Sequence, residues 1–411
     1  MTALLLKNAH IVDGTASERS DRVNVLIENS IVRDMGKAVS SASANVIDVA
    51  GRTLMPGLID CHVHVTAVVA SLGANAKLPD SLVMARSIAV MRDMLHRGFT
   101  TVRDVGGADF GLKQAASEGL FPAPRLVISG KALSQTGGHC DFRGRYDDTP
   151  APRTRIPLGS LGRVCDGVPD VRRAAREEVK AGADFIKIMA NGGCASPTDP
   201  IHFNGFSREE LNAVVEEAQN ASTYVSAHLY TDEAISRCVE AGVRSLEHCN
   251  LIKSETAKLA AERGCIAVPT LVTYDRLASE GASLGVPPDA IAKVEDVRSA
   301  GMESLEIMED AELLMAYGSD LLGEMHRHQS EEFVIRGRIL PAHKVISAAT
   351  SVAAKLLGME GLIGTIAPGA FADLVVVDGN PLSNLSLLTQ QGAHISLIMQ
   401  GGKVIKNITP R

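Results

Sequence analysis

Residues 56–64 of the chain read PGLIDCHVH, and this stretch decides the fold. A short apolar run leads into two histidines, His62 and His64, which is typical of a buried strand that ends in polar side chains. Because side chains alternate along a strand, both imidazoles point to the same face. Two such imidazoles can chelate one metal ion, although packing alone also explains a pair of this kind.

Seven further apolar runs of strand length follow, and segments of helix length separate several of them. Eight parallel strands that alternate with helices predict an α/β fold, a closed (β/α)8 TIM barrel. The predicted strands are residues 58–65, 100–105, 126–129, 185–189, 224–228, 245–248, 266–270 and 315–320. The clearest predicted helices are residues 171–181, 208–219, 233–241 and 255–263, and Gly98, Gly182, Gly242 and Gly264 mark helix ends.

Both ends of the chain contain short β-segments with turn signals between them. They are residues 4–12, 23–28, 31–35 and 46–48 at one end, and 373–378 and 395–405 at the other. We therefore expect a small β-sandwich domain formed from both chain termini. The predicted boundaries are residues 1–55 plus 358–411 for this domain and 56–357 for the barrel.

The composition excludes several classes of partner. Hydrophobic residues make up 45% of the 411 residues, and the net charge of −7 argues against binding to nucleic acid. The chain has no run of about 18 apolar residues without charge, so we expect no membrane partner. Seven cysteines without a CxxC pair, and no visible signal peptide, favour a cytoplasmic protein.

Later predicted strands also carry chemically active side chains, namely Lys187 in FIKIM, His228, His248 and Asp320. Such barrels build their active sites at the C-terminal ends of their strands. An unpaired ammonium is costly to bury, so Lys187 must be paired, neutral or modified, unless its stem carries the charge outward between helices. A neutral lysine amine can react with CO2 to give a carbamate, whose two oxygens could bridge two metal ions.

These motifs resemble the amidohydrolase superfamily in its binuclear, carboxylated-lysine form. The matching stretches are PGLIDCHVH, the lysine of strand four, HLYT, EHCN, GSD and the late run GTIAPGAFADLVVVDGNP. Within that superfamily, QTGGH at 135–139, KIMANGGCASPTDP at 187–200 and PTLVTYD at 269–275 are similar to bacterial prolidase-like and Xaa-amino-acid dipeptidases. N-acyl amino acid hydrolases and ochratoxin-hydrolysing amidohydrolases are close relatives of that group.

The resemblance implies a ligand set for two divalent metal ions, with zinc as the expected metal. His62, His64, Lys187 and Asp320 would bind the more buried ion, and carboxylated Lys187, His228 and His248 the more exposed one. A hydroxide shared by both ions would be the nucleophile, because zinc lowers the pKa of bound water to near 7. Asp320 would accept its proton and return it to the leaving amine.

Four residues are candidates for contact with the substrate. Tyr230, two residues after His228, could donate its phenol to the developing oxyanion, and His139 could contact a substrate carboxylate or carbonyl. Arg143 and Arg145 are weaker candidates for a carboxylate clamp, because loop arginines are usually solvated. The pair Gly192–Gly193 would let the backbone approach the substrate closely, or belong to a plain loop.

Several cysteines and histidines near the motifs remain without a role. Alternation along the strand turns Cys61 away from His62. Cys140 and Cys249 could narrow the pocket or make the enzyme sensitive to oxidation. His326 and His328, in MHRHQS at 325–330, more readily fit a contact with substrate or a neighbouring subunit than a third metal.

The sequence therefore predicts a metal-dependent enzyme that hydrolyses an amide bond and releases a C-terminal amino acid. Expected substrates are Xaa-Pro-like or Xaa-hydrophobic dipeptides, N-acyl amino acids and bulky amides such as ochratoxin A, and the protein is expected to be a homo-oligomer. Alternatives are a hydrolase of a cyclic amide or lactone and a mononuclear deaminase, both disfavoured by Lys187. A non-catalytic scaffold is disfavoured because all six ligand positions are filled.

Overall fold

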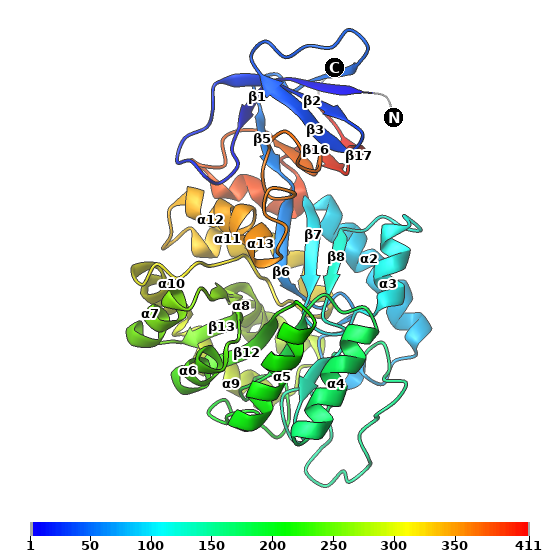
Figure 1. Ribbon diagram of the computed structural model, residues 1–411, viewed down its shortest axis with the longest axis vertical. Helices are drawn as coiled ribbons and strands as arrows, with labels where there is room; N and C mark the ends of the chain where they lie inside the picture. The colour runs from blue at the N-terminus through cyan, green and yellow to red at the C-terminus, as the bar shows by residue number, and fades with distance from the viewer. Residues whose placement is uncertain (1–2, 410–411) are drawn as a thin grey trace. The chain divides into compact units, whose positions relative to one another are not determined.

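The computed structural model describes residues 3–409 and divides the chain into two compact units. The first, here called the terminal unit, comprises the chain up to Asp60, Arg92–Val102 and the residues from Ser330 onward. The second, the site unit, comprises Cys61–Met91 and Arg103–Gln329. Figure 1 colours both by residue number.

Strands from the two ends of the chain form one sheet of eight strands in the terminal unit. Its order is β17-β16-β15-β5-β1-β2-β3, and β4 pairs with β1. The sequence predicted a small β-sandwich from both termini; the strands do come from both ends of the chain, and they share a single hydrogen-bonded path. The strands are β1 Leu4–Ile11, β2 Arg22–Glu28, β3 Ile31–Gly36, β4 Asn45–Asp48, β5 Thr53–Pro56, β15 Leu374–Val377, β16 Ile395–Gln400 and β17 Lys403–Asn407.

Strand β5 joins the two halves of this sheet. It pairs antiparallel with β15 and parallel with β1, so one short strand bridges segments from opposite ends of the chain. One face of the sheet encloses an apolar core that includes Leu6, Val25, Leu54 and Val376. The sequence analysis missed β5, because four residues ending in Pro56 give too short a pattern to distinguish from a linker.

The site unit is built on parallel strands, as the sequence predicted. Six of them form a sheet in the order β10-β9-β11-β12-β13-β14, and a second sheet has the order β6-β7-β8. The strands are β6 Leu58–Val63, β7 Phe99–Asp104, β8 Arg125–Ile128, β9 Ala132–Ser134, β10 Gly162–Val164, β11 Ile186–Met189, β12 Val225–Thr231, β13 Ser245–Leu251 and β14 Ile266–Val268. The sequence analysis predicted no strand at the positions of β9 and β10.

The predicted eighth strand, residues 315–320, is not a strand. Within residues 3–409 this segment contributes one isolated parallel bridge, from Met315 to Ala267 of β14, and its extended course ends at Asp320, where φ is +51°. The left-handed backbone at Asp320 turns the chain at the end of this segment. The ladders of the described residues therefore form separate parallel sheets and do not by themselves make a closed barrel.

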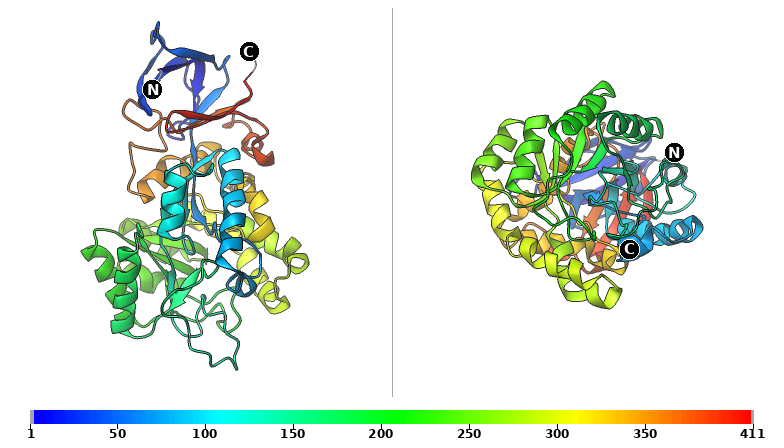
Figure 2. Two further views of the ribbon diagram at one scale, coloured as in Figure 1. Left: turned by 90° about the vertical axis from the view of Figure 1, so that its right-hand side faces the viewer. Right: turned by 90° about the horizontal axis from the view of Figure 1, so that it is seen from below.

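Helices follow the strands of the site unit and surround them in the view from below (Figure 2). The four predicted helices are confirmed as α4 to α7, and Gly242 ends α6 in the left-handed conformation at φ +96°. The helices are α1 Leu72–Asn75, α2 Asp80–His96, α3 Phe110–Ser117, α4 Val168–Lys180, α5 Arg208–Asn220, α6 Asp232–Ala241, α7 Ser254–Glu262, α8 Leu271–Glu280, α9 Pro288–Arg298, α10 Gly301–Asp310, α11 Glu332–Arg336, α12 Ala342–Ala348 and α13 Ser351–Leu356. Short 3-10 helices are η1 Gly281–Leu284, η2 Gly323–Glu331, η3 Leu385–Leu388 and η4 Gln390–Gly392. Among the described residues, no helix combines the length and the apolar character that crossing a membrane requires.

Candidate active site

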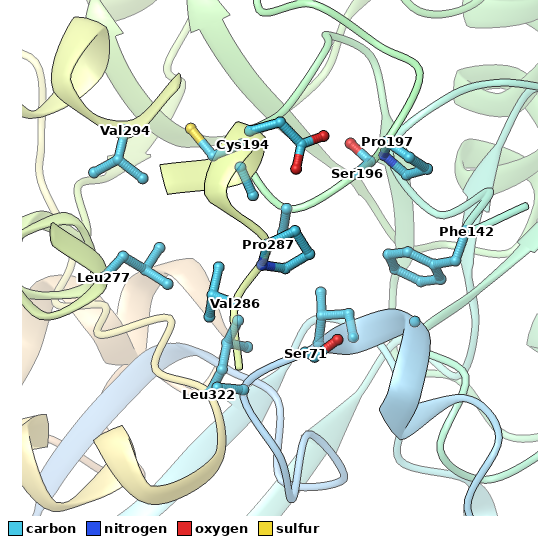
Figure 3. A pocket seen from close by; sticks show the side chains of 16 residues that line it. Ser71, Phe142, Cys194, Ser196, Pro197, Leu277, Val286, Pro287, Val294 and Leu322 are labelled. Carbon is cyan, nitrogen blue, oxygen red and sulfur yellow. The ribbon is translucent and has the colours of Figure 1, made fainter. Parts of the chain in front are cut away.

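All six predicted metal ligands line one cavity of the site unit, with an empty volume of about 550 Å³. They come from the parallel strands β6, β11, β12 and β13, from the residue after β6 and from the segment after α10: His62, His64, Lys187, His228, His248 and Asp320. His139 and Tyr230 line the same cavity. A second, largely apolar pocket shares part of its wall (Figure 3). The structure thus brings together side chains that lie up to 258 positions apart in the sequence, from His62 to Asp320.

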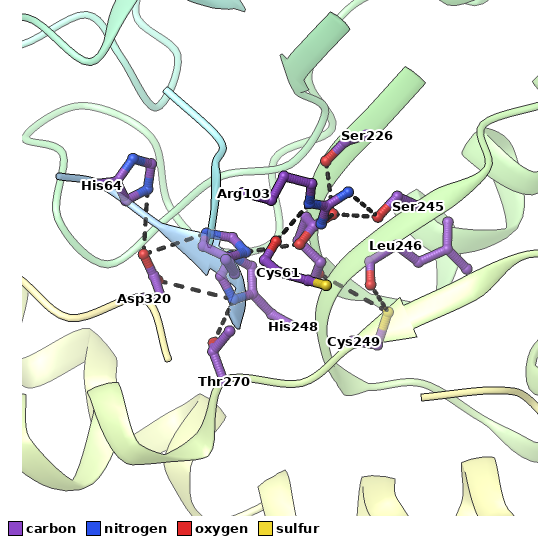
Figure 4. A network of polar contacts seen from close by, with 12 residues as sticks. Cys61, His64, Arg103, Ser226, Ser245, Leu246, His248, Cys249, Thr270 and Asp320 are labelled. Atoms are coloured by element: carbon purple, nitrogen blue, oxygen red, sulfur yellow. Dashed lines mark hydrogen bonds and ion pairs between the residues drawn. The ribbon is translucent and has the colours of Figure 1, made fainter. Parts of the chain in front are cut away.

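The Asp320 carboxylate is the centre of the cluster (Figure 4). Its Oδ1 atom lies 3.3 Å from the Nε2 atoms of both His62 and His64, and its Oδ2 atom lies 4.0 Å from Nδ1 of His248. Ligand atoms of His62, His248 and Asp320 all lie within 4.8 Å of one another. This spacing is compact enough for the three side chains to share one metal ion.

The second ring nitrogens of His62 and His64 are already engaged. Nδ1 of His62 lies 2.7 Å from Oε2 of Glu247, and Nδ1 of His64 lies 2.8 Å from the carbonyl oxygen of Gly106. Both partners are acceptors, so each Nδ1 carries the proton, and in the neutral rings each Nε2 presents a lone pair to the Asp320 carboxylate. Lone pairs facing an anion require a cation or a proton between them, and the donor set therefore fits a metal ion.

A buried ion pair contacts the Nδ1 atom of His62 through Glu247. Arg103 is fully buried, and its Nη2 atom donates to Oε1 of Glu247 at 2.8 Å, while its Nε atom donates to the carbonyl oxygen of Cys61 (Figure 4). Burial raises the pKa of Glu247, but the charge of Arg103 outweighs it and holds that pKa well below the usual range. Glu247 is therefore an ionised acceptor that fixes the orientation of the His62 ring.

The sequence analysis assigned no role to Glu247 or Arg103. Glu247 directly precedes His248 in EHCN, and Arg103 interrupts the apolar run of residues 100–105. A charged residue inside a buried strand was a usable signal in both cases, because such groups are rarely buried without a partner. The partner itself could not be found, since Arg103 and Glu247 are 144 residues apart.

Lys187 lies in β11 with only 1% of its surface exposed, and its side chain lines the cavity. Burial lowers the pKa of its ammonium group to about 8. About a tenth of the amine is then neutral at pH 7, and the neutral form is the one that can react with CO2. The structure therefore places Lys187 inward rather than between helices at the surface.

His228 and His248 are held in the neutral form that metal binding requires. Burial is the largest cause that lowers the pKa of each imidazole well below the usual value, and the neighbouring imidazoles His139 and His62, respectively, add to it. The two rings lie 4.7 Å apart between centroids. Neutral imidazoles offer lone pairs, whereas protonated ones would repel a cation.

The backbone is strained at two of the candidate ligands. His248 and Asp320 both adopt left-handed conformations, with φ of +71° and +51°. Residues other than glycine rarely adopt this region, and such conformations concentrate at functional sites. At His248 the turn breaks the simple alternation along the strand, so Cys249 faces away, with its Sγ atom 3.6 Å from the carbonyl oxygen of Leu246.

The ring of His139 stacks on the ring of His228. The two rings are stacked with 4.3 Å between centroids, and Nδ1 of His139 lies 2.7 Å from Oγ of Ser196 and 3.4 Å from Oδ2 of Asp199. Gly193 allows this arrangement, because a Cβ atom there would lie 1.9 Å from the His139 ring. The predicted role of Gly193 as an approach for substrate is therefore replaced, in this geometry, by contact with His139.

Tyr230 lies near the end of β12 and is buried at the cavity wall. The hydroxyl of Tyr274 donates to the hydroxyl of Tyr230 at 3.2 Å, and Tyr230 also forms a hydrogen bond with the Cys194 thiol. Tyr274 lines the cavity too, and sequence reasoning missed it although it lies in the quoted motif PTLVTYD. Burial raises the pKa of both phenols well above the usual value, so both keep their protons.

Two of the predicted substrate contacts lie outside this cavity. Arg143 is engaged by Asp141, with Nε to Oδ1 at 2.8 Å and Nη2 to Oδ2 at 2.6 Å, and Arg145 is exposed. Neither residue is part of the cavity wall. A bidentate pair with Asp141 satisfies the guanidinium of Arg143, so the carboxylate clamp expected from this loop is not formed.

The remaining motif residues have local partners. Cys140 lines the cavity, and Cys61 contributes its backbone carbonyl to Arg103. His326 is buried, with Nε2 at 3.1 Å from the carbonyl oxygen of Ala67, and His328 lies 2.8 Å from Glu280. The expected contact of these histidines with substrate or a neighbouring subunit stays a prediction.

Comparisons with known proteins agree with this geometry. The family model described as the amidohydrolase family matches residues 53–405. Ochratoxinase from Aspergillus niger is 31% identical, over 86% of this chain and 75% of the relative. A crystal structure described as an amidohydrolase is 52% identical, with a TM-score of 0.97 and 99% of both chains covered. A prolidase structure complexed with N-methylphosphonate-L-proline is 48% identical, with a TM-score of 0.97, and covers 99% of this chain and 100% of the other.

Proposed function

Because the chain belongs to the amidohydrolase family, and is therefore a hydrolase, we propose that it cleaves an amide bond and releases a C-terminal amino acid. The observation that carries this proposal is the convergence of four imidazoles, Lys187 and Asp320 on one cavity. The similarity to ochratoxinase and to the prolidase bound to a proline derivative supports the same reaction class. Dipeptides and N-acyl amino acids are the expected substrates.

We propose that the cavity holds two divalent ions, with zinc preferred. His62, His64 and Asp320 would hold the more buried ion, His228 and His248 the more exposed one, and a carboxylated Lys187 would bridge them. The lone pairs aimed at Asp320 and the neutral state of the imidazoles support this donor set. The bound ions would supply Lewis-acid activation of water and of the scissile carbonyl.

The side chains of the chain then have separate tasks. The pKa of Asp320 is raised by burial, but the neighbouring His62 outweighs this and holds it well below the usual range, so its carboxylate can accept a proton from the attacking water. Asp320 would pass that proton to the leaving nitrogen. Tyr230 keeps its proton and can donate it to the carbonyl oxygen as negative charge develops there. His139 would contact the substrate carboxylate or carbonyl.

We also propose that the parallel strands of the site unit close into the predicted (β/α)8 barrel, and that the chain has a separate terminal domain. Backbone hydrogen bonds between the separate ladders support closure. Asp184 N donates to Ile128 O at 2.7 Å, Ala267 N to Leu314 O at 2.9 Å, and Cys61 N to Tyr317 O at 2.7 Å. In such a barrel the candidate ligands would lie at the C-terminal ends of the strands.

The cysteines bear on the location of the protein. All seven are free and buried, which supports the proposal that the protein works in the reducing cytoplasm.

The test is hydrolysis of a library of dipeptides and N-acyl amino acids by metal-loaded enzyme, together with metal analysis. We expect two ions per chain, and loss of one ion and of most activity in Lys187→Ala. For the best substrate, replacing the free carboxylate by a methyl amide should lower kcat/KM by about 30-fold to 1000-fold. Equal rates on both forms, or full occupancy and turnover in Lys187→Ala, would contradict the proposal and favour a cyclic amide, a lactone or mononuclear chemistry.

A further inference from the structure

A second pocket opens from the cavity of the candidate ligands. Its empty volume, which includes open solvent, is about 680 Å³. The two spaces are neighbours, because they share five wall residues: Leu72, Cys194, Ala195, Leu277 and Leu322. A molecule whose scissile bond lies beside Asp320 could therefore extend into this second pocket, here called the antechamber.

The wall of the antechamber is almost entirely apolar. Leu277 and Val294, from α8 and α9, lie on one side in Figure 3, and Phe142 lies on the other, with Val286 between them. Val294 and Val286 are buried, and so are the shared leucines. A wall of this kind binds an aliphatic or aromatic side chain and gives a small residue such as glycine little to contact.

One charged group interrupts this wall. Among the 16 lining residues, Asp289 is the only one that carries a charge at neutral pH, and the set contains no lysine, arginine or histidine. Within residues 3–409 the Asp289 side chain has no ion-pair partner. It lies in the first turn of α9, where a carboxylate also favours the helix, and it is exposed to solvent. Lys293, four residues further along α9, is held by the carbonyl oxygens of Gly193 and Ser196, so the Asp289 carboxylate is the charged group on the pocket wall itself, where it repels a substrate carboxylate and attracts an ammonium group.

From this wall we propose that the antechamber is the binding site for the N-terminal residue of a dipeptide, with its apolar side chain against the leucines and valines and its free α-ammonium beside Asp289. The inference rests on the proposed amide hydrolysis and narrows its substrate class. The enzyme would then favour dipeptides with a large apolar N-terminal residue over N-acyl amino acids that lack the amine. The C-terminal residue, with its carboxylate, occupies the side of His139 and Tyr230.

The test compares two substrates that differ only in the amine. One is a leucine-containing dipeptide, and the other is the same C-terminal amino acid acylated with 4-methylpentanoate. Wild-type enzyme should favour the dipeptide, and Asp289→Asn should lower kcat/KM for the dipeptide by about fivefold, the size expected for an exposed ion pair, without changing the acylated analogue. Asp289→Lys should reverse the preference. Asp296→Asn, on the same helix but outside the pocket, should change neither value.

A second comparison tests the apolar wall. Wild-type enzyme should favour leucine over glycine at the N-terminal position by about tenfold or more in kcat/KM, and Phe142→Ala should reduce that ratio. An unchanged substrate preference in Asp289→Asn, or a wild-type preference for the acylated analogue, would overturn the subsite.

Binding measurements separate the subsite from the reaction. Calorimetry with L-leucinamide and with 4-methylpentanamide as probes should show tighter binding of the amine, and this difference should disappear in Asp289→Asn. If that difference is present but neither substrate is hydrolysed, the subsite stands and the proposed function fails. If both substrates are hydrolysed and the probes bind equally, the proposed function stands and the subsite fails.

Discussion

At the scale of single residues, Asp320 is the contact on which the candidate site depends. Three imidazoles face its carboxylate within 4.0 Å, and its own backbone is left-handed at φ +51°. A substitution that keeps the shape of the side chain but removes its charge therefore tests its chemistry without a change in packing.

We expect Asp320→Asn to fold normally and to lower turnover by a factor of about 100 or more, because the amide cannot accept the proton. In the wild type, the pKa of Asp320 lies well below its ordinary 3.8, so activity should decline on the acid side as this carboxylate protonates. Any stability that its ionised form contributes should be present above about pH 4 and lost as the pH falls through the folded value. Circular dichroism and a pH profile of kcat measure both effects. Unchanged turnover in the variant would assign the proton to another group.

The buried pair of Arg103 and Glu247 supports the site from behind. Glu247→Gln keeps the volume but leaves the charge of Arg103 without its partner, so the free energy of unfolding should fall by about 3 to 5 kcal/mol. Metal affinity should weaken by about tenfold to a hundredfold, because His62 loses its ionised acceptor. Denaturant unfolding and metal titration measure the two effects. The matched control is Glu177→Gln, whose partner Arg163 lies in a half-exposed pair and whose loss should cost about 1 kcal/mol or less.

The sequence predicted the residues whose role depends on local pattern. Alternation placed His62 and His64 on one face, and the polar ends of strands predicted His228, His248 and Asp320. It failed where the role depends on a distant partner. Arg143 lies in the predicted loop but is held by Asp141, and Glu247 is fixed by an arginine from another strand. The spacing of residues along the chain does not show which side chains pair with one another in the folded protein.

At the scale of elements, the loop of residues 192–200 positions His139. Gly193 lies against the imidazole, and the side chains of Ser196 and Asp199 hold its Nδ1 atom. Lys293 of α9 donates to the carbonyl oxygens of Gly193 and Ser196 at 3.1 and 2.9 Å, which ties the loop to the helix. The orientation of His139 therefore depends on a glycine that carries no functional group of its own.

Gly193→Ala should displace the His139 ring, because the new Cβ atom would lie 1.9 Å from it. We expect kcat/KM to fall by about tenfold to a hundredfold, the cost of a misplacement near 1 Å, with bound metal unchanged. Steady-state kinetics and metal analysis of the purified variant measure this. Gly144→Ala is the control, since a Cβ atom there meets nothing within 4 Å. Equal activity of the two variants would show that His139 does not contribute to the reaction.

Predicted elements agree with the structure where periodicity is strong. Helices α4 to α7 and strands β11 to β13 lie within a few residues of the prediction. Short elements were lost, because β9 and β10 each contain three residues and carry no readable period. The pattern of residues 315–320 predicts a strand. The backbone instead turns at Asp320, whose carboxylate lines the cavity, so the geometry of the site outweighs the preference of this segment for a strand.

At the scale of the whole molecule, removing the metal should be visible in stability. The Nε2 atoms of His62 and His64 both lie 3.3 Å from the Asp320 carboxylate, where a shared metal ion would hold the three side chains together. Metal at about 1,000 times its Kd contributes about 4 kcal/mol, so chelation should lower Tm by on the order of 5 °C and added zinc should restore it. Scanning calorimetry with and without chelator measures the shift. In the double variant His62→Ala/His64→Ala, the Tm should change much less on addition of chelator. A wild-type Tm that does not change with chelator would argue against the proposed ions.

The terminal sheet was foreseen as a union of both chain ends, because each end repeats short β-segments with turns. How the ends join was not foreseen. Four residues, Thr53–Pro56, make the connection by pairing with Leu374–Val377. Pairing across more than 300 residues leaves no trace in local composition, and only the apolar alternation of each strand can be read.

The pairing of β5 with β15 has a consequence for how the chain folds during its synthesis. About 320 residues separate β5 from β15, so at roughly 5 to 20 residues per second the ribosome needs roughly 15 to 65 seconds to deliver the missing partner. During that interval the outer edge of β5 offers open backbone donors and acceptors, which can recruit strands from other nascent chains. Growth conditions that slow elongation or raise expression should therefore increase the insoluble fraction, and trigger factor or another holdase that covers early β-segments should reduce it.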